Sequence, residues 1–297
     1  MIINRANLSI LHTGFQSSFS QGFEGAAPDY ERLTMEVNSS TAIEQYAWLG
    51  ATTGFREWLG DRVIQNLMQY DYSIKNKSFE NTVGVPREAI EDDQFGVYSP
   101  LMQQLGQDAR EHPATLVWDL MKAGFTTKCY DGQFMFDTDH PVLDANGVEQ
   151  SVSNYQAGAN PAWFLIDDTR VMKPVIKQNR KAYNFVMMDG ETDDNVFMRK
   201  EYLYGVDARM NVGFGLWQLA YASKATLDAA NFNTVYAAMQ SLKGDNERPL
   251  GIRPSLLVVP PSLRAAALAV VKAERDAAGA TNINRDVVEV ISTPWLA

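Results

Sequence analysis

The chain has very little cysteine and histidine: its 297 residues include one Cys and three His. The single thiol, Cys129, excludes a disulfide within the chain and fits assembly in a reducing cytoplasm. Neither residue type occurs in the paired spacing of a structural zinc site. The sequence therefore predicts no metal and no cofactor.

Long apolar runs, internal repeats, low-complexity segments and an excess of positive charge are also absent. No stretch approaches the roughly 18 apolar residues of a membrane span, and the first residues lack the apolar centre of a signal peptide. The 36 acidic residues outnumber the 26 Lys and Arg, giving a net charge of −10. A protein that reads nucleic acid needs Lys and Arg to replace phosphate counterions, so this class is excluded. A protein that lies near nucleic acid without binding it tightly is still allowed.

The strongest pattern present is helical and runs from residue 92 to residue 125. Its first apolar residues recur every four positions: Val97, Leu101, Leu105 and Ala109. Acids at 91–93 precede this pattern and Gly124 follows it, which predicts a favourable helix dipole at the start and a stop at the end. Pro113 lacks an N–H and clashes with the preceding helical turn. We therefore expect one long rod, kinked or broken near Pro113.

The first 31 residues are largely polar and small, and they contain three phenylalanines spaced by four: Phe15, Phe19 and Phe23. This spacing allows either a short helix or a poorly ordered tail. Since a tail cannot bury three phenylalanines alone, we expect it to become ordered against a neighbouring subunit.

Two segments before the long helix alternate as strands do. Leu33, Met35 and Val37 predict one strand. Residues 70–85 predict a hairpin around residues 76–78, or two linked strands, with polar side chains on both faces. A strand pair of this kind is marginal alone, so we expect it to lean on another molecule.

The second half alternates short apolar strands with helices. The predicted strands are 163–166, 171–176, 183–188, 196–204, 256–259 and 287–291. The predicted helices are 227–242 and 262–278. This order predicts a mixed α/β or α+β domain.

The densest set of reactive side chains follows the long helix: Cys129, Asp131, Asp137, Asp139 and His140. A cysteine near a histidine can form a nucleophile–base pair, and the same set can bind a metal. The favoured interpretation is a turn with capped carboxylates.

Three other motifs have structural interpretations that we favour over functional ones. Gly213 and Gly215 lie within a strand, without the third glycine of a dinucleotide fingerprint, which indicates close sheet packing. The acids at 91–93 could bind a divalent cation, although the helix dipole suffices to explain them. A basic run could meet phosphate, but ion pairing with Asp167, Asp168 or a neighbour is favoured. This run consists of Lys173, Lys177, Arg180 and Lys181.

A set of motifs in fixed order resembles the major head subunit of Mu-like bacteriophages along essentially the whole chain. The motifs are VNSST at 37–41, WLG at 48–50, EWLG at 57–60, YSIKNKSFENTVG at 72–84, EDD at 91–93, CYDGQ at 129–133, HP at 140–141, KP at 173–174 with Gln178 and Arg180, GFGLWQ at 213–218, and VVP at 258–260. Each motif alone is weak, and their order and spacing as a set is specific.

The resemblance implies an α+β fold, the HK97-like phage capsid fold. It implies an N-terminal arm at 1–32 and a region at 33–91 that includes an extended β-hairpin loop at about 60–88. A peripheral domain with the spine helix would occupy 92–180. An axial α/β domain and returning peripheral strands would occupy 181–297.

The implied function is that of a major capsid protein, not an enzyme. It would assemble as pentamers and hexamers into an icosahedral head that encloses DNA, with scaffold and portal proteins as partners, in the cytoplasm of a bacterial host. Two alternatives are open. One is an encapsulin-like nanocompartment shell protein of the same fold, and the other, from a different class of protein, is a cysteine hydrolase that uses Cys129 and His140. Some relatives of the fold cross-link a loop lysine to a neighbour's asparagine. Lys75 and Lys77 lie in the right region, but no motif demands a cross-link and we predict none.

Overall fold

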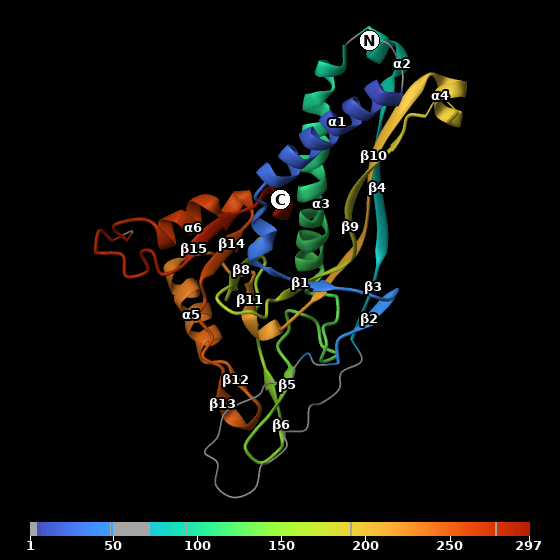
Figure 1. Ribbon diagram of the computed structural model, residues 1–297. Helices are drawn as coiled ribbons and strands as arrows, with labels where there is room; N and C mark the ends of the chain where they lie inside the picture. The colour runs from blue at the N-terminus through green and yellow to red at the C-terminus, as the bar shows by residue number, and fades with distance from the viewer. Residues whose placement is uncertain (1–4, 48, 50–71, 93, 191, 277) are drawn as a thin grey trace, which may run out of the picture.

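The chain folds into an elongated limb that projects from a wider body (Figure 1). The structure is a computed structural model, and it describes residues 5–47, 49, 72–92, 94–190, 192–276 and 278–297. The helices are α1 (Arg5–Gly25), α2 (Arg87–Glu91), α3 (Ser99–Ala123), α4 (Asp194–Arg199), α5 (Ala229–Gln240) and α6 (Arg264–Val271). None of these described helices combines the length and apolar character that a membrane crossing requires.

The strands are short except for three in the limb. They are β1 (Thr34–Asn38), β2 (Ile43–Gln45), β3 (Ser73–Lys75), β4 (Lys77–Pro86), β5 (His140–Leu143), β6 (Glu149–Val152), β7 (Tyr155–Gln156), β8 (Trp163–Ile166), β9 (Val175–Met188), β10 (Glu201–Phe214), β11 (Ala220–Ser223), β12 (Lys243–Gly244), β13 (Arg248–Pro249), β14 (Leu256–Val259) and β15 (Glu289–Ser292).

The limb is built on a four-stranded sheet in the order β1-β9-β10-β4. β9 and β10 are antiparallel, and α4 joins them at the far end of the limb (Figure 1). β4 pairs antiparallel with β10, and β1 pairs parallel with β9. α3 packs on β10, and α1 packs on α3 and β9.

The predicted long helix is confirmed, but its predicted break is wrong. α3 runs unbroken from Ser99 to Ala123 with Pro113 inside it. The carbonyl that loses its main-chain donor at Pro113 is that of Ala109, four residues earlier. The helix continues because it is packed on both sides of the proline, with Ala109 buried before it and Val117 buried after it. The alternative, a kink at Pro113, stays a prediction.

The acids at 91–93 do not begin this helix. Glu91 ends α2 and pairs with Arg87 at 2.9 Å, and Asp92 caps the same helix end. α3 begins later, at Ser99, with a proline and without an acid in its first turn. The predicted dipole role is therefore wrong for Glu91 and Asp92, because they lie at the carboxyl end of a different, short helix. Asp93 lies outside the described residues. The predicted stop at Gly124 is confirmed, and a Cβ there would lie 2.7 Å from the Phe136 ring.

Pro113 marks the boundary between two hydrophobic cores. Before it, α3 contributes Met102, Leu105 and Ala109 to the core of the limb. After it, the same helix contributes Val117 and Trp118, among others, to the larger core of the body. One helix therefore holds the two parts of the molecule together.

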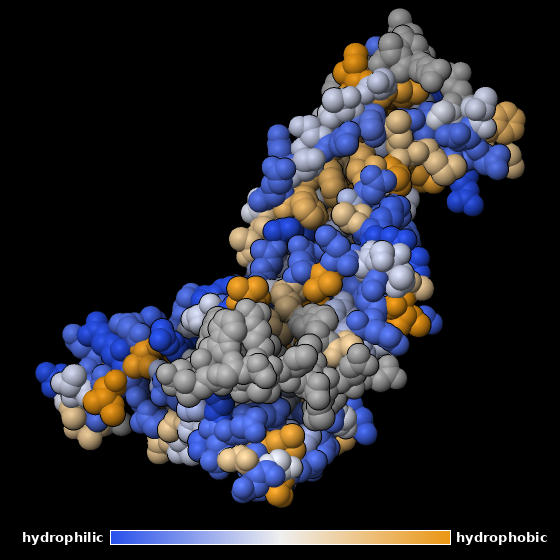
Figure 2. Space-filling model, turned by 60° about the horizontal axis from the view of Figure 1, so that its bottom comes forward, coloured by the Kyte–Doolittle hydropathy of each residue, from blue (hydrophilic) through white to orange (hydrophobic). Residues whose placement is uncertain are grey.

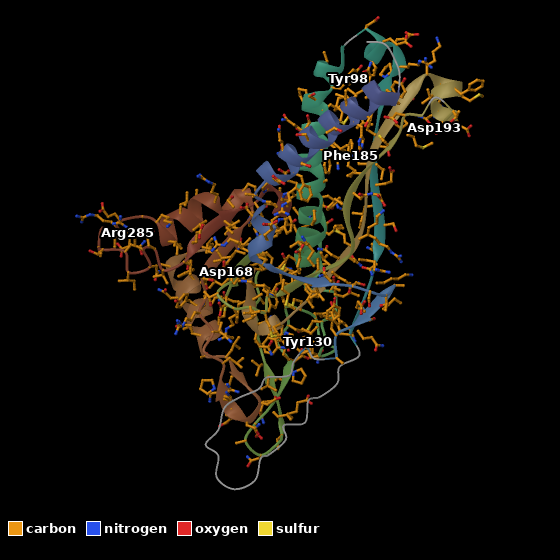
Figure 3. All side chains as sticks on the ribbon, in the orientation of Figure 1. Tyr98, Tyr130, Asp168, Phe185, Asp193 and Arg285 are labelled. Carbon is orange, nitrogen blue, oxygen red and sulfur yellow. The ribbon has the colours of Figure 1, made fainter. Side chains whose placement is uncertain are left out.

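The N-terminal segment is a 21-residue helix that docks on its own chain. α1 buries Phe15 and Phe19, and Phe15 meets Tyr204 edge-on with ring centroids 5.0 Å apart. Phe19 lies 5.3 Å from Phe185, a β9 residue that Figure 3 places beside α1. Of the two alternatives left open by the sequence, the structure has the helix. The expectation that it needs a neighbouring subunit is wrong, since β9, β10 and α3 cover its phenylalanines.

Reciprocal glycines bring α1 and α3 into backbone contact. A Cβ on Gly22 would lie 1.9 Å from the main-chain oxygen of Gln103, and a Cβ on Gly106 would lie 2.1 Å from that of Phe19. Both distances are far below any real contact, so each glycine is required by the closeness of the other helix.

The body contains a five-stranded sheet in the order β15-β14-β8-β11-β7. β8, β11 and β14 are buried at every residue, which explains the uninterrupted apolar sequences of β8 and β14. The predicted strands 163–166 and 256–259 are confirmed, as is a helix within 227–242. Two further predicted elements exist but have other bounds: α6 ends at Val271, and β15 begins at Glu289.

Three predictions of local structure differ from the structure in whole or in part. Of the two alternatives for residues 70–85, of which 72–85 are described, the hairpin is wrong and two linked strands are confirmed: β3 pairs with β2, and β4 with β10. Of the predicted strand 171–176 only residues 175 and 176 are in a strand, and they join residues 183–188 in one long strand, β9. Residues 196–199 are helical, because the side chain of Asn195 donates to the main-chain oxygens of Met188 and Glu201 and closes a tight turn there.

Some of the domain boundaries implied by the resemblance can be compared with the helices and strands of the structure. The boundary between residues 180 and 181 falls inside β9 and does not separate two units. Of the extended loop expected at about 60–88, residues 60–71 lie outside the described part of the chain. Residues 77–86 form β4 within the sheet of the limb.

Candidate functional site

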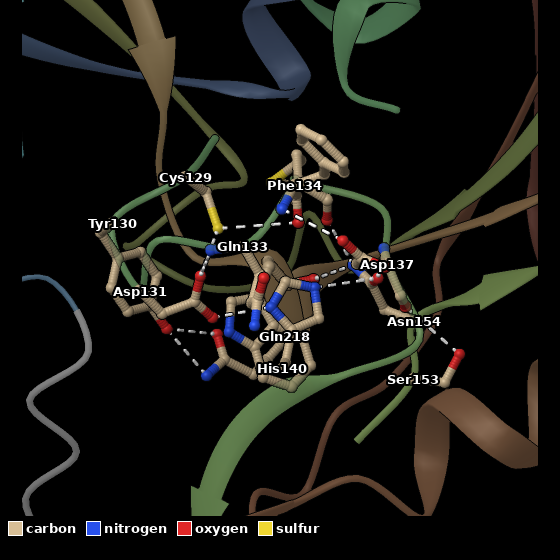
Figure 4. A network of polar contacts seen from close by, with 12 residues as sticks. Cys129, Tyr130, Asp131, Gln133, Phe134, Asp137, His140, Ser153, Asn154 and Gln218 are labelled. Carbon is tan, nitrogen blue, oxygen red and sulfur yellow. Dashed lines mark hydrogen bonds and ion pairs between the residues drawn. The ribbon is translucent and has the colours of Figure 1, made fainter. Parts of the chain in front are cut away.

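The reactive cluster after α3 forms a buried polar network (Figure 4). Cys129 Sγ donates to Asp131 Oδ1 at 3.0 Å, and Asp131 Oδ2 lies 2.7 Å from His140 Nδ1. A tight turn holds the first two residues together, because the main-chain N–H of Gln133 also donates to Asp131 Oδ1. His140 is fully buried and Cys129 is 4% exposed. The carboxylate therefore lies between the thiol and the imidazole.

Two residues from distant segments complete the network. Asn154 Oδ1 lies 3.2 Å from His140 Nε2, and its amide nitrogen donates to the main-chain oxygen of Met135 at 2.8 Å. The indole of Trp217 stacks on the imidazole with ring centroids 4.0 Å apart and 10° between the planes. These contacts tie the connection after α3 to the sheet of the body.

The geometry is unsuited to a nucleophile–base pair. Burial and the Asp131 carboxylate raise the pKa of the Cys129 thiol, so the thiolate is disfavoured. Burial alone would raise the pKa of Asp131, but hydrogen bonds from His140, Cys129 and Gln133 hold it below its usual value. Both ring nitrogens of His140 already have hydrogen-bond partners, Asp131 Oδ2 and Asn154 Oδ1, and neither bonds to the Cys129 thiol.

Among the described residues, Cys129, Asp131 and His140 are the group whose donor atoms could hold a metal, since these atoms lie within 4.8 Å of one another. Each already has a hydrogen-bond partner within the network. The arrangement is therefore complete as a structural network, and the expectation of no metal stays a prediction.

The Cys129 thiol should be chemically inert in the folded chain. We expect iodoacetamide to label it at least about 100-fold more slowly than in the urea-unfolded chain, because alkylation needs an accessible thiolate. Mass spectrometry over time measures both rates. A Ser17→Cys variant supplies an exposed control thiol on α1. Equal rates for Cys129 in the folded and unfolded chains would contradict the buried network.

The other two acids of the cluster differ in role. Asp137 caps its own turn, accepting from the main-chain N–H groups of Phe134 at 3.3 Å and Thr138 at 2.8 Å. Asp139 is exposed and lies outside the network. The predicted turn with capped carboxylates is thus confirmed for Asp131 and Asp137. The sequence did not predict that Asn154 and Trp217 belong to this network. Trp217 lies in the motif GFGLWQ, and this was the only indication in the sequence that it matters.

The glycines and the basic run have the structural roles that were favoured. A Cβ on Gly213 would lie 2.3 Å from the Ile74 side chain, and one on Gly215 would lie 2.2 Å from the Lys173 main-chain oxygen. Close backbone packing is therefore confirmed for both glycines. Gly213 lies in β10, whereas Gly215 lies just past its end, so the prediction that both lie within a strand holds for Gly213 alone.

The basic run forms ion pairs, but with other acids than expected. Lys177 pairs with Glu36 at 2.5 Å, and Lys181 pairs with Asp207. Asp168 instead forms a salt bridge with Arg32 at 2.8 Å, and Asp167 forms one with Arg170 at 3.2 Å. Lys173 donates to the main-chain oxygen of Asp168. Burial alone would raise the pKa of the Asp168 carboxyl, but the hydrogen bonds from Ser255 and Arg32, and after them the charge of Lys173, hold it below its usual value. Arg180 is exposed.

The complete fold matches solved phage shells. The chain superposes on a subunit of the procapsid of bacteriophage JBD30 with a TM-score of 0.91 and 48% identity, covering 99% of this chain and all of the other. The subunit of the JBD30 capsid gives 0.80 and 36% over the full length of both chains. The protein thus has the HK97-like fold of a phage capsid subunit, as predicted.

The sequence comparisons narrow this class to one family. A family model described as Mu-like prophage major head subunit gpT matches residues 8–296. The Mu-like prophage FluMu major head subunit of Haemophilus influenzae is 44% identical over 271 residues, 89% of this chain and 88% of that protein. The major capsid protein of Escherichia phage Mu is 38% identical over 293 residues, 97% of this chain and 96% of that protein. The chain belongs to the Mu-like major head subunit family, whose members are structural capsid proteins and not enzymes.

Proposed function

We propose that this chain assembles as pentamers and hexamers into the wall of an icosahedral phage or prophage head. The observation that carries the proposal is the likeness to the JBD30 procapsid subunit over nearly all of both chains. The TM-score falls from 0.91 with the procapsid to 0.80 with the capsid. This difference supports a further part of the proposal, that the described conformation is the one in which the chain enters a procapsid.

The two parts of the molecule suit the domain plan of the fold. We propose that α1 is the arm, that α3 with the sheet of β1, β9, β10 and β4 is the peripheral domain, and that the body is the axial domain. This proposal follows the two sheets and the two cores instead of a single boundary along the chain.

The expected partners follow from the same role. We propose that the shell encloses DNA without sequence-specific binding. The net charge of −10 supports this, because a shell protein that bound DNA tightly would need an excess of Lys and Arg. Scaffold and portal proteins and assembly in the host cytoplasm belong to the same proposal. The absence of a covalent cross-link through Lys75 or Lys77 stays a prediction.

Particle formation tests the proposed function. We expect the purified chain, or the chain co-expressed with scaffold and portal, to form closed shells in electron micrographs and capsomer masses in native mass spectrometry. A compact monomer that persists under all of these conditions would contradict the proposal. Shells that co-purify with an enzyme cargo and without DNA or portal would favour the nanocompartment alternative instead.

A further inference from the structure

A groove lies on the limb between α3, β4 and the last residues of the chain. We call it the spine groove. Its volume is about 370 Å³, and its lining includes Leu105, Ala109 and His112 of α3, Phe79 of β4, and Trp295. Leu105 and Ala109 are almost fully buried and form the floor, whereas Trp295 is 40% exposed at the rim. The groove therefore offers an apolar floor to an incoming side chain.

The rim of the spine groove is acidic. Glu80 of β4 and Asp108 and Glu111 of α3 line it, and none of its described lining residues is Lys or Arg. The remaining titratable group, His112, is bonded to the Tyr183 hydroxyl at 2.6 Å, and burial lowers its pKa, so it adds no positive charge near neutral pH. An occupant with apolar and positively charged side chains would complement this surface.

The far end of the same limb has this complementary chemistry. The α4 tip consists of Phe197, Met198, Arg199 and Lys200, all exposed. Phe197 is 80% exposed and Met198 is 74% exposed, although both are large and apolar. Apolar side chains are visible at this end of the limb in Figure 2, and Figure 3 places Asp193, which precedes α4, there as well.

Charge at the α4 tip is divided along the short helix. Asp193 and Asp194 lie at its start, and Asp193 accepts the main-chain N–H of Gly190 at 2.8 Å. The two cations lie at its end, next to Phe197 and Met198. Lys200 reaches Glu88 at 3.3 Å, but both side chains are more than 70% exposed, so this pair is weak and easily exchanged.

We propose that the α4 tip of one copy docks in the spine groove of a second copy. Phe197 and Met198 would cover the apolar floor, and Arg199 and Lys200 would meet the carboxylates of Glu80, Asp108 and Glu111. Because the tip and the groove are different surfaces of one chain, the contact is head-to-tail, and repeated contacts of this kind close into a ring when the rotation from copy to copy completes a full turn. The proposal rests on the proposed function, since it assigns one of the contacts between subunits of the shell.

Disulfide trapping tests the contact directly, because Cys129 is buried and does not interfere. Copies carrying Met198→Cys and copies carrying Asn81→Cys, distinguished by size tags, are co-expressed and oxidised within assembled shells. Asn81 lines the groove and is exposed. We expect a mixed 198–81 dimer on non-reducing gels. The control pairs Asn81→Cys with Ile283→Cys, an 82% exposed residue of the body, and should give no such dimer.

A charge exchange tests the energetics of the same contact. Arg199→Glu with Lys200→Glu should lower the yield of shells at least about tenfold, because it places like charges opposite each other. Adding Glu80→Lys and Asp108→Lys to the same chain should restore the yield. An unchanged yield after the first pair of substitutions, or no rescue by the second, overturns the proposal.

The outcomes separate this proposal from the proposed function. Shells that form normally but give 198–198 dimers, links to another protein, or no link from position 81 overturn the docking contact alone. Failure of the unsubstituted chain to form any shell counts against the proposed function.

Discussion

Replacing Gly106 with alanine should loosen the N-terminal helix from the spine. The new Cβ would lie 2.1 Å from the Phe19 main-chain oxygen and 2.8 Å from the Phe23 nitrogen. Both are backbone atoms, so α1 must shift as a unit. Overpacking costs about 1–3 kcal/mol, and the lost aromatic contacts add to it, while alanine returns up to about 1 kcal/mol of helix propensity. We expect a net loss of about 2 kcal/mol in the free energy of unfolding.

Urea unfolding measures this loss, and chymotrypsin reports where it occurs. Phe15 is 1% exposed in the docked helix, so cleavage after it requires undocking. Gly14→Ala is the matched control, because Gly14 lies in α1 next to Phe15 and a Cβ on it would meet nothing within 4 Å. This control should be neutral or slightly stabilising. If Gly106→Ala behaves like Gly14→Ala in both measurements, the close crossing of α1 and α3 is wrong.

This crossing shows why the arm was only partly predictable. The spacing of Phe15, Phe19 and Phe23 predicts a helical stripe from local sequence alone. What covers the stripe depends on α3 and on Phe185 and Tyr204, all far along the chain. The glycines that permit the contact are 84 positions apart, between residues 22 and 106, and neither has a local signal for the other. A periodic pattern predicts the element, and only packing decides its partner.

The same distinction between local pattern and distant packing separates the strands and helices that could be predicted from those that could not. β8 and β14 could be predicted because strands buried on both faces have continuous apolar sequences. Residues 196–204 alternate as a strand would, yet the first four are helical, because Asn195 bonds to main-chain oxygens on either side of the turn. Pro113 was expected to break the spine because its missing N–H acts locally, whereas the two cores that hold the helix on either side of it include residues far along the chain.

The reactive cluster was predicted as a set because its members are close in sequence. Cys129, Asp131 and His140 do come together, and the favoured structural interpretation follows from burial and from the position of the carboxylate. Asn154 and Trp217 escaped prediction because an asparagine in a polar loop and a tryptophan in an apolar strand have common structural roles. Their function in the network exists only in the fold.

Asn154→Ala should be among the most destabilising single substitutions in the body. The side-chain amide nitrogen donates to the main-chain oxygens of Met135 at 2.8 Å, Ala220 at 3.2 Å and Trp217 at 3.4 Å. Its oxygen accepts the Asp137 N–H at 3.0 Å. Each buried group left without a partner costs about 1–3 kcal/mol, so the total loss in the free energy of unfolding should reach about 4 kcal/mol.

The main-chain hydrogen bonds of residue 154 survive this substitution, so the measurement isolates the side chain. Its N–H donates to the Asp137 oxygen at 3.1 Å, and its oxygen accepts the Ala222 N–H at 3.0 Å. Asn160→Ala is the control, since that side chain is exposed and bonds only to Thr226 Oγ1 at 3.3 Å. It should change stability by less than about 0.5 kcal/mol. Urea unfolding of both variants measures the two free energies of unfolding. Equal stability of the two variants would mean that the network around His140 does not hold the segment after α3 against the sheet of the body.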